Sequence, residues 1–165
     1  MGGCRPRPWV GTCGCYARAV ERRASVPGDA ARRAASRAAE LLAADRRVRL
    51  VYVFGSAADP ARSAVGDVDL AVLADPPLSL DELGRRQADL AEATGAPIDL
   101  VSLNDAPIVL AHEVVEGGRC LFARDDDIET EFVTRTRTRF WDFTPYRETQ
   151  WRLAGERQAE RSRGS

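Results

Sequence analysis

The sequence predicts an α/β fold, in which helices flank a small β-sheet. Short segments rich in β-branched residues alternate with longer segments of helical periodicity. The predicted order is α-β-β-α-β-α-β-α, which is typical of a sheet covered by helices. The chain has 165 residues, of which 44% are hydrophobic and 30% charged, so one domain with its own core is expected.

The first elements are predicted from composition. Residues 29–44 form a helix because alanine, the strongest helix former, recurs through them. The segment VRLVYVF at 48–54 is a buried strand, and DVDLAVL at 67–73 is a second strand. Both are rich in the β-branched and apolar residues that favour strands.

A second helix and a third strand follow. Residues 80–94 form a helix, because Ser79 and Glu82 have the spacing of a capping box. Gly95 ends this helix, since glycine is the residue that most readily takes the left-handed conformation after a last helical turn. The apolar segment PIDLVSL at 97–103 is the third strand.

The C-terminal elements are a helix at 106–116, which Asn104 or Asp105 would cap, and a strand at 119–124. The segment that begins at Asp125 carries two competing patterns. Its apolar residues have helical spacing, whereas VTRTRTR alternates as a strand does. We favour a helix, because the three acidic residues at its start suit the positive end of a helix dipole.

Three regions are distinguished along the chain. Residues 28–150 form the folded domain. Residues 1–27 are rich in arginine, glycine and cysteine without a clear period, so a disordered N-terminal extension is expected. A wrongly chosen start codon or an arginine-rich transit peptide would also explain them. Residues 151–165 are expected to be a disordered tail.

Charge and cysteine content exclude several classes of protein. The net charge of −1 gives no overall basic field for nucleic acid. No apolar run reaches the length of a membrane span, and the N-terminus lacks the apolar core of a signal peptide. Cys13 and Cys15 have no second Cys/His pair to complete a zinc site, so they are interpreted as incidental thiols. A reducing cytoplasm is the expected location.

Three aspartates stand in or beside the predicted strands. Because side chains alternate along a strand, Asp67 and Asp69 share one face. Asp99 lies in the middle of the apolar strand 97–103, where an unpaired acid is costly. If that strand lies beside 67–73, the three carboxylates meet, and they would hold two Mg²⁺ ions for phosphoryl or nucleotidyl transfer.

Gly55-Ser56 ends the first strand and supplies a second part of this predicted site. Glycine lets the backbone approach a phosphate closely. Residues 57–63 could begin a short helix whose N–H groups face an anion. A triphosphate and its metal would then meet between Ser56 and the aspartate pair.

Each feature alone has an ordinary structural explanation, since Asp-x-Asp is usually a solvated turn and Gly-Ser is almost uninformative. Their combination is specific. Gly-Ser, ten further residues, Asp-x-Asp and a downstream aspartate resemble the signature of the DNA polymerase beta-like nucleotidyltransferase superfamily. The chain is most similar to its smallest members, the MNT-type minimal nucleotidyltransferases, over residues 30–145.

The resemblance implies the nucleotidyltransferase fold, with a small mixed sheet, and Mg²⁺-dependent transfer of AMP from ATP. Asp67, Asp69 and Asp99 would be the catalytic and metal-binding residues, and Asp99 would help to deprotonate the acceptor hydroxyl. Gly55 and Ser56 would contact the triphosphate. MNT proteins are typically antitoxins that adenylylate a tyrosine of a HEPN-family toxin, which is therefore the expected partner.

The loop after Ser56 departs from the family pattern. Many members carry basic residues here, whereas this chain has Ala-Ala-Asp-Pro, and Arg62 is the only nearby base. Either Arg62 binds the nucleotide instead, or nucleotide affinity is low, or activity is lost. Two alternatives to a protein adenylyltransferase follow: transfer to a small molecule such as an aminoglycoside, and an inactive antitoxin that binds its toxin directly.

Two further features have ordinary interpretations. His112 is the sole histidine, and we expect an exposed helix residue rather than a general base. Arg135, Arg137 and Arg139 could bind RNA, but a solvated helix face is the favoured interpretation.

Overall fold

A computed structural model describes residues 25–143. The predicted tail 151–165 lies outside the described residues, as does most of the predicted extension 1–27. The last two residues of that extension form a short strand, β1 (Val26–Pro27), which pairs antiparallel with β3 (Ala64–Val65).

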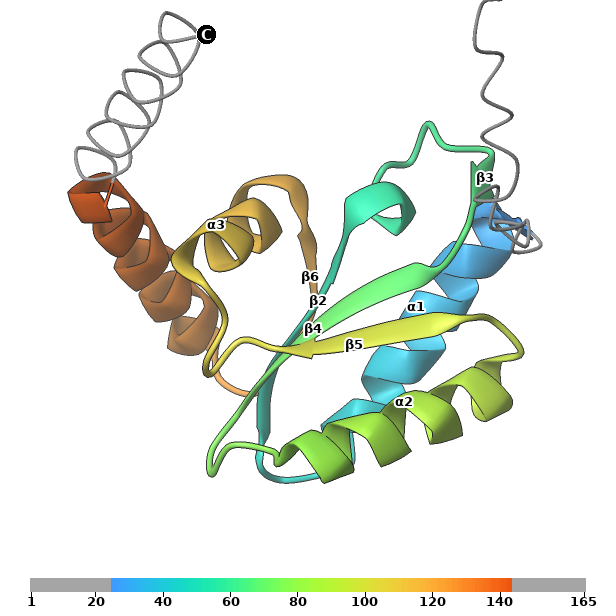
Figure 1. The fold of residues 1–165 in the computed structure, drawn as a ribbon, viewed down its shortest axis with the longest axis horizontal. Coiled ribbons are helices and arrows are strands. Elements are labelled where there is room, and N and C mark those ends of the chain that lie inside the picture. Colours follow the sequence, from blue (N-terminus) through green and yellow to red (C-terminus); the bar gives the residue numbers. More distant parts are fainter. Residues whose placement is uncertain (1–24, 144–165) are drawn as a thin grey trace, which may run out of the picture.

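The main sheet has four strands in the order β5-β4-β2-β6. The strand β4 pairs antiparallel with β2 and parallel with β5, so the sheet is mixed, as predicted (Figure 1). The strand bounds are β2 (Val48–Phe54), β4 (Val68–Ala74), β5 (Ile98–Ser102) and β6 (Arg119–Ala123), each within two residues of prediction.

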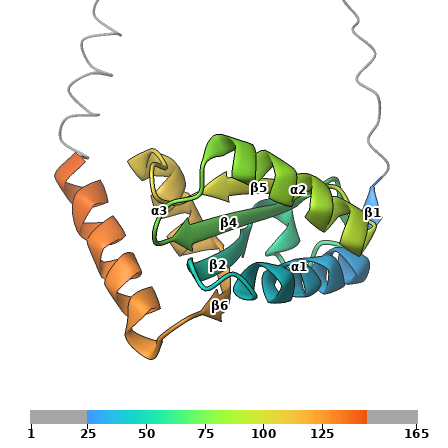
Figure 2. The ribbon, with the colours of Figure 1, turned by 90° about the horizontal axis from the view of Figure 1, so that it is seen from below.

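Two helices, α1 (Gly28–Ala43) and α2 (Leu80–Thr94), cover one face of this sheet (Figures 1 and 2). The alanines of α1 make this packing close, because a small side chain lets the helix approach the valines of β2 and β4. Both helices match the predicted bounds to within one residue. This face holds the larger of the two apolar clusters.

The other face is covered only in part, by α3 (Ile108–Gly117) and a C-terminal helix of residues 126–143 (Figure 1). Val114 and Phe132 are buried there against Leu50 and Tyr52. The Tyr52 hydroxyl donates a hydrogen bond of 2.7 Å to Glu129 Oε1, which satisfies it inside the core.

The last described element is a helix, as favoured, and its apolar residues Ile128 and Phe132 pack against the sheet. Two contacts tie it to α3. Arg137 Nε donates to Glu116 Oε1 at 2.7 Å, and the ring of Phe140 stacks on His112 with centroids 3.6 Å apart. The expectation that His112 is exposed was wrong, since this stack covers it in part. No helix within residues 25–143 has the length and apolarity of a bilayer span.

The predicted cap of α3 was also wrong. Neither Asn104 nor Asp105 caps this helix, which begins at Ile108 after Pro107 without a side-chain cap. The Asn104 amide instead donates to Ala74 O at 2.8 Å and accepts from Ala74 N at 3.1 Å. This paired contact satisfies both backbone groups at the end of β4, so the side chain is not free to cap a helix.

The capping box of α2 is confirmed. Ser79 Oγ accepts from Glu82 N at 3.3 Å, and Glu82 Oε2 accepts from Ser79 N at 2.9 Å. A hydrogen bond from Arg47, together with those of the cap, lowers the pKa of Glu82 to about 2, so the carboxylate stays charged. Gly95 ends the helix at φ 68°, as predicted.

We therefore expect Ser79→Ala to lower the free energy of unfolding by about 1 kcal/mol, because the N–H of Glu82 loses its partner. Urea unfolding followed by circular dichroism measures this loss. Ser36→Ala, at an exposed position inside α1, is the matched control and should change stability by less than about 0.5 kcal/mol. Equal losses in the two variants would contradict the role of the cap.

Candidate active site

The strand β4 is buried on one face and acidic on the other. Val68 and Leu70 are fully buried against α1 and α2. Asp67 and Asp69 alternate with them and therefore point to the opposite face, at the end that α3 leaves open. Because Val68 and Leu70 are buried on one face of the strand, Asp67 and Asp69 share the other face, as predicted.

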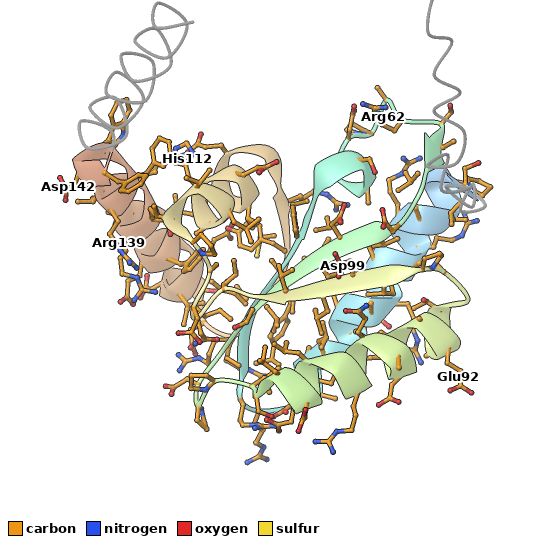
Figure 3. The ribbon with its side chains drawn as sticks, viewed as in Figure 1. Arg62, Glu92, Asp99, His112, Arg139 and Asp142 are labelled. Carbon is orange, nitrogen blue, oxygen red and sulfur yellow. The ribbon has the colours of Figure 1, made fainter. Side chains whose placement is uncertain are left out.

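Asp99 lies on the same open face. The parallel pairing of β4 and β5 puts Asp69 directly beside Asp99, about 4.8 Å away at the backbone. On its other side Asp69 pairs with Phe54, the residue before Gly55. The expected neighbourhood of the strands 67–73 and 97–103 is confirmed, and it brings all three predicted acids to one end of the sheet, where Figure 3 labels Asp99.

Asp69 is the most strongly perturbed acid of this group. Partial burial raises its pKa to about 6, and repulsion by Asp67, Asp99 and Glu113 adds to the shift. Each of these charges disfavours ionisation of the Asp69 carboxyl. The site therefore holds a concentration of negative charge that a bound cation would relieve.

Glu113 is a site residue that the sequence did not identify. The packing of α3 decides its position: Val114 is fully buried against the sheet, and Gly118 lies so close to β2 that a Cβ on it would stand 2.9 Å from Val53 O. No spacing in the sequence relates α3 to the aspartates, so only the packed structure reveals this fourth acid.

Gly55 is required by the approach of Asp69. It has φ +61°, and a Cβ built on it would stand 2.5 Å from Asp69 Oδ2. Any side chain here would collide with the carboxylate as well as strain the backbone. Ser56 follows in the short 3₁₀ helix η1 (Gly55–Ala57) and makes no hydrogen bond through its hydroxyl to another residue of 25–143.

The segment 57–63, which could have begun a short helix, does not form one. The helical turn covers only Gly55–Ala57, with Ala58 N donating to Gly55 O at 3.3 Å. Asp59 Oδ1 then accepts from Ala61 N at 2.9 Å, which forms a side-chain turn around Pro60. Because proline has no N–H and this turn replaces helical bonds, the helix cannot extend.

Arg62 lies on the exposed loop beside the site (Figure 3). The loop is anchored next to it, because Gly28 N donates to Ser63 O at 2.8 Å. Arg62 Nε stands 3.7 Å from Asp59 Oδ2, a loose exposed ion pair that contributes little to stability. The guanidinium is therefore free to reorient toward an anion.

A cavity of about 810 Å³ adjoins the carboxylates on the side of β5. Asp67 and Asp99 form part of its wall, with Pro97 and Ile98 beside them. Gln87 also lies in this wall and accepts from Leu100 N at 3.2 Å, so it covers a backbone group at the edge of the sheet. Residues 25–27 and Ala30 of α1 border the same space.

The carboxylates of this site fit a hard cation whose remaining ligands come from a substrate. Within residues 25–143 no three acidic, histidine or cysteine side chains are close enough together to hold a metal unaided. Mg²⁺ does not require that, because it usually takes one or two carboxylates together with substrate phosphates and water. Asp67 and Asp69 are the carboxylates in position for this, with Asp99 adjacent.

Comparison with known proteins agrees with this geometry. The profile of the family described as polymerase beta, nucleotidyltransferase matches residues 37–127, more than half of the chain. The chain belongs to this nucleotidyltransferase family. The matched range contains the Gly-Ser turn and all three aspartates.

One curated nucleotidyltransferase relative is the protein adenylyltransferase MntA of Shewanella oneidensis. It is 35% identical over 92 residues, and the alignment covers 54% of this chain and 64% of the relative, just under two thirds of its length.

Solved structures share the nucleotidyltransferase fold. One is the tri-AMPylated HEPN toxin of Shewanella oneidensis in complex with its MNT antitoxin, which matches with a TM-score of 0.64 and 25% identity over 75% of this chain and 98% of the matched one. Another is a toxin–antitoxin complex with AMP-PNP, with a TM-score of 0.66 and 25% identity over 72% of this chain and 97% of the matched one.

The contact between Gly55 and Asp69 gives a prediction for stability. Gly55 and Gly95 have nearly the same positive φ, but a Cβ on Gly95 meets nothing within 4 Å. Gly95→Ala should lose about 1 kcal/mol from backbone strain alone. Gly55→Ala should lose more than Gly95→Ala, because the Asp69 carboxylate must move away from the added methyl group. Urea unfolding measures both variants, and equal losses would refute the close approach.

The charge on Asp69 gives a second prediction. Its pKa is raised in the folded protein, so ionisation costs stability above pH 6, and the cost disappears as the pH falls below the ordinary value of 3.8. Asp69→Asn should therefore stabilise the protein at pH 8 in EDTA by about 1–2 kcal/mol, a value reduced for solvent screening.

The gain from Asp69→Asn should shrink at pH 5, where the wild-type carboxyl is already largely protonated. Unfolding in urea at both pH values measures it. Asp89→Asn, an exposed change on α2, is the control and should have no comparable effect. A loss of stability at pH 8 would contradict the repulsion among the acids.

Proposed function

We propose that this protein is a Mg²⁺-dependent adenylyltransferase that transfers AMP from ATP to a hydroxyl group of a protein partner. The observation that carries the proposal is the meeting of Asp67, Asp69 and Asp99 beside the Gly55-Ser56 turn. Membership of the nucleotidyltransferase family and the similarity to MntA support it.

Asp67 and Asp69 would hold the Mg²⁺ ions, and Asp99 would complete the site. The metal would neutralise charge on the triphosphate and on the leaving pyrophosphate. The fit rests on Asp69, because burial and then the repulsion of three neighbouring acids raise its pKa to about 6, a cost that a bound cation would relieve. Because Gly55 has no side chain, it leaves space for the Asp69 carboxylate and for a phosphate.

The remaining steps belong to this chain's own groups. Backbone N–H groups of the Gly55–Ala57 turn and the Ser56 hydroxyl bind the triphosphate, and Arg62 reorients toward it. Asp99 accepts the proton of the attacking hydroxyl. The hydroxyl oxygen bonds to the α-phosphorus as the bond to the bridging oxygen breaks, and pyrophosphate leaves with that oxygen.

The acceptor is proposed to be a tyrosine hydroxyl of a HEPN-family toxin, which would make this protein the antitoxin of a pair that acts in the cytoplasm. Two similar structures support this, because one is a complex with a tri-AMPylated HEPN toxin and another contains AMP-PNP. The cavity of about 810 Å³ beside Asp99 provides space for an acceptor side chain.

A second candidate is an antitoxin that neutralises its toxin by contact alone. The loop after Ser56 favours it, since Arg62 is the single base there and is drawn toward Asp59. Without further basic groups, affinity for the triphosphate depends on Mg²⁺ and on the backbone of the turn. An experiment must therefore distinguish a transferase from an antitoxin that acts by contact alone.

The test incubates the purified protein with Mg²⁺, ATP labelled at its α-phosphate, and the HEPN-type protein encoded next to it. Label on the toxin is expected, at its tyrosine. Asp67→Asn and Asp69→Asn should each reduce labelling by at least about a hundredfold, because each removes a carboxylate that holds the metal. Mass spectrometry locates the modified residue.

Asp89→Asn, on the exposed surface of α2, is the matched control and should label normally. Tight binding of the toxin without any label, unchanged in Asp67→Asn, would overturn the transferase and establish the contact-only antitoxin. Label on an added aminoglycoside but not on the toxin would instead identify a small-molecule transferase.

A further inference from the structure

A second cavity, of about 280 Å³, lies between α3 and the C-terminal helix, away from the aspartates. Leu103 and Phe132 lie in its wall, although most of the surface that lines it is polar. Leu73, also in its wall, is four residues along β4 from Asp69, which corresponds to roughly 13 Å of strand. The cavity is therefore separate from the candidate active site, and nothing above assigns it a role.

The wall formed by the C-terminal helix is basic. Arg135 and Arg139 are one helical turn apart and both line the cavity (Figure 3 labels Arg139). Among its lining residues there is no acid, and neither arginine forms an ion pair within the described part of the chain. Arg137, between them in sequence, points elsewhere and pairs with Glu116.

Thr136 adds a buried polar group to the same wall. Its side chain lines the cavity although the residue is only 4% exposed. Its hydroxyl hydrogen-bonds to no other residue among 25–143, whereas the hydroxyl of Thr138 donates to Thr134 O at 3.0 Å, as is usual in a helix. Within residues 25–143 the buried side-chain atom that lacks a hydrogen-bond partner is Arg49 Nε, so the Thr136 hydroxyl remains accessible from the cavity and can bind another molecule there.

We propose that this cavity binds a phosphate monoester of about mononucleotide size. Two arginines and a threonine of one helix line this cavity, with the Arg135 guanidinium 5.8 Å from the centre of the Phe132 ring, and a tetrahedral phosphate can accept from all three side chains. A planar carboxylate would be satisfied by a single guanidinium fork. The cavity is larger than a phosphate needs, and Leu103 and Phe132 in its wall can contact a ring attached to that phosphate. This proposal does not depend on the transferase activity.

The test is a titration of the full chain with AMP, inorganic phosphate and adenosine in EDTA, followed by NMR of the backbone amides. AMP should shift the amides of Ala111 and Thr136 more than that of Gly55, because EDTA removes the metal that the active site needs. Inorganic phosphate should bind the same place more weakly. Adenosine, which has no phosphate, should leave these amides unshifted.

Variants make the assignment specific. Arg135→Ala with Arg139→Ala should weaken AMP binding at least tenfold. Thr136→Val keeps the shape of the side chain and should weaken it about three- to tenfold, since one hydrogen bond to a charged group is lost. Arg85→Ala, on the exposed surface of α2, removes the same charge elsewhere and should leave the affinity unchanged.

Shifts confined to Gly55 and its neighbours, or adenosine shifting Thr136 as strongly as AMP does, would overturn the proposal. Equal affinity for AMP in the wild type and in Thr136→Val would overturn it as well. Because Thr136→Val is isosteric, this result is informative even if the double arginine variant does not fold. Loss of toxin labelling with unchanged AMP shifts at Thr136 would refute the transferase and leave this site intact.

Discussion

The repulsion among carboxylates at the open end of β4 is the constraint on which the rest of the site depends. Asp69 is partly desolvated and surrounded by Asp67, Asp99 and Glu113. The strand tolerates this because its other face is buried. Burial of each valine or leucine there contributes about 1.5–3 kcal/mol, which exceeds the cost of about 1–2 kcal/mol for ionising Asp69. The fold can therefore tolerate an ionised Asp69 without a bound cation.

The central place of β4 in the sheet explains how the site is assembled. Its antiparallel partner β2 brings Phe54 and then Gly55 beside Asp69, and its parallel partner β5 brings Asp99. A one-residue slip of either pairing would turn the acids toward the core. The apolar side chains that exclude such slips thus also hold the chemical groups in register.

Coverage of the second face divides it into two regions. The acids lie where α3 ends and solvent enters, whereas α3 and the C-terminal helix close the other end over Tyr52. The contacts between these two helices, Glu116 with Arg137 and His112 with Phe140, leave a cavity beside them instead of a filled core. Helix packing on one face thus creates both an open site and a second hollow.

Local sequence was sufficient to predict those elements whose ends are set by residues close to them in the chain. The cap at Ser79, the glycine that ends α2 and the alternation along β4 act over a few residues, so their predictions agree with the structure. Asn104 shows the opposite case, because a partner 30 residues away, Ala74, takes the amide that would have capped α3. The loop at Pro60 is not helical, because the turn formed by the Asp59 side chain replaces helical hydrogen bonds.

The sequence by itself determined the fold class, the strand faces and the family signature, because periodicity and short motifs express local geometry. Only the tertiary structure decided that Glu113 faces Asp69, that a methyl group on Gly55 would strike a carboxylate, and that Thr136 lines a cavity between two arginines. These facts depend on the distances between elements far apart in the chain. Such distances are set by how side chains pack, and no spacing in the sequence records them.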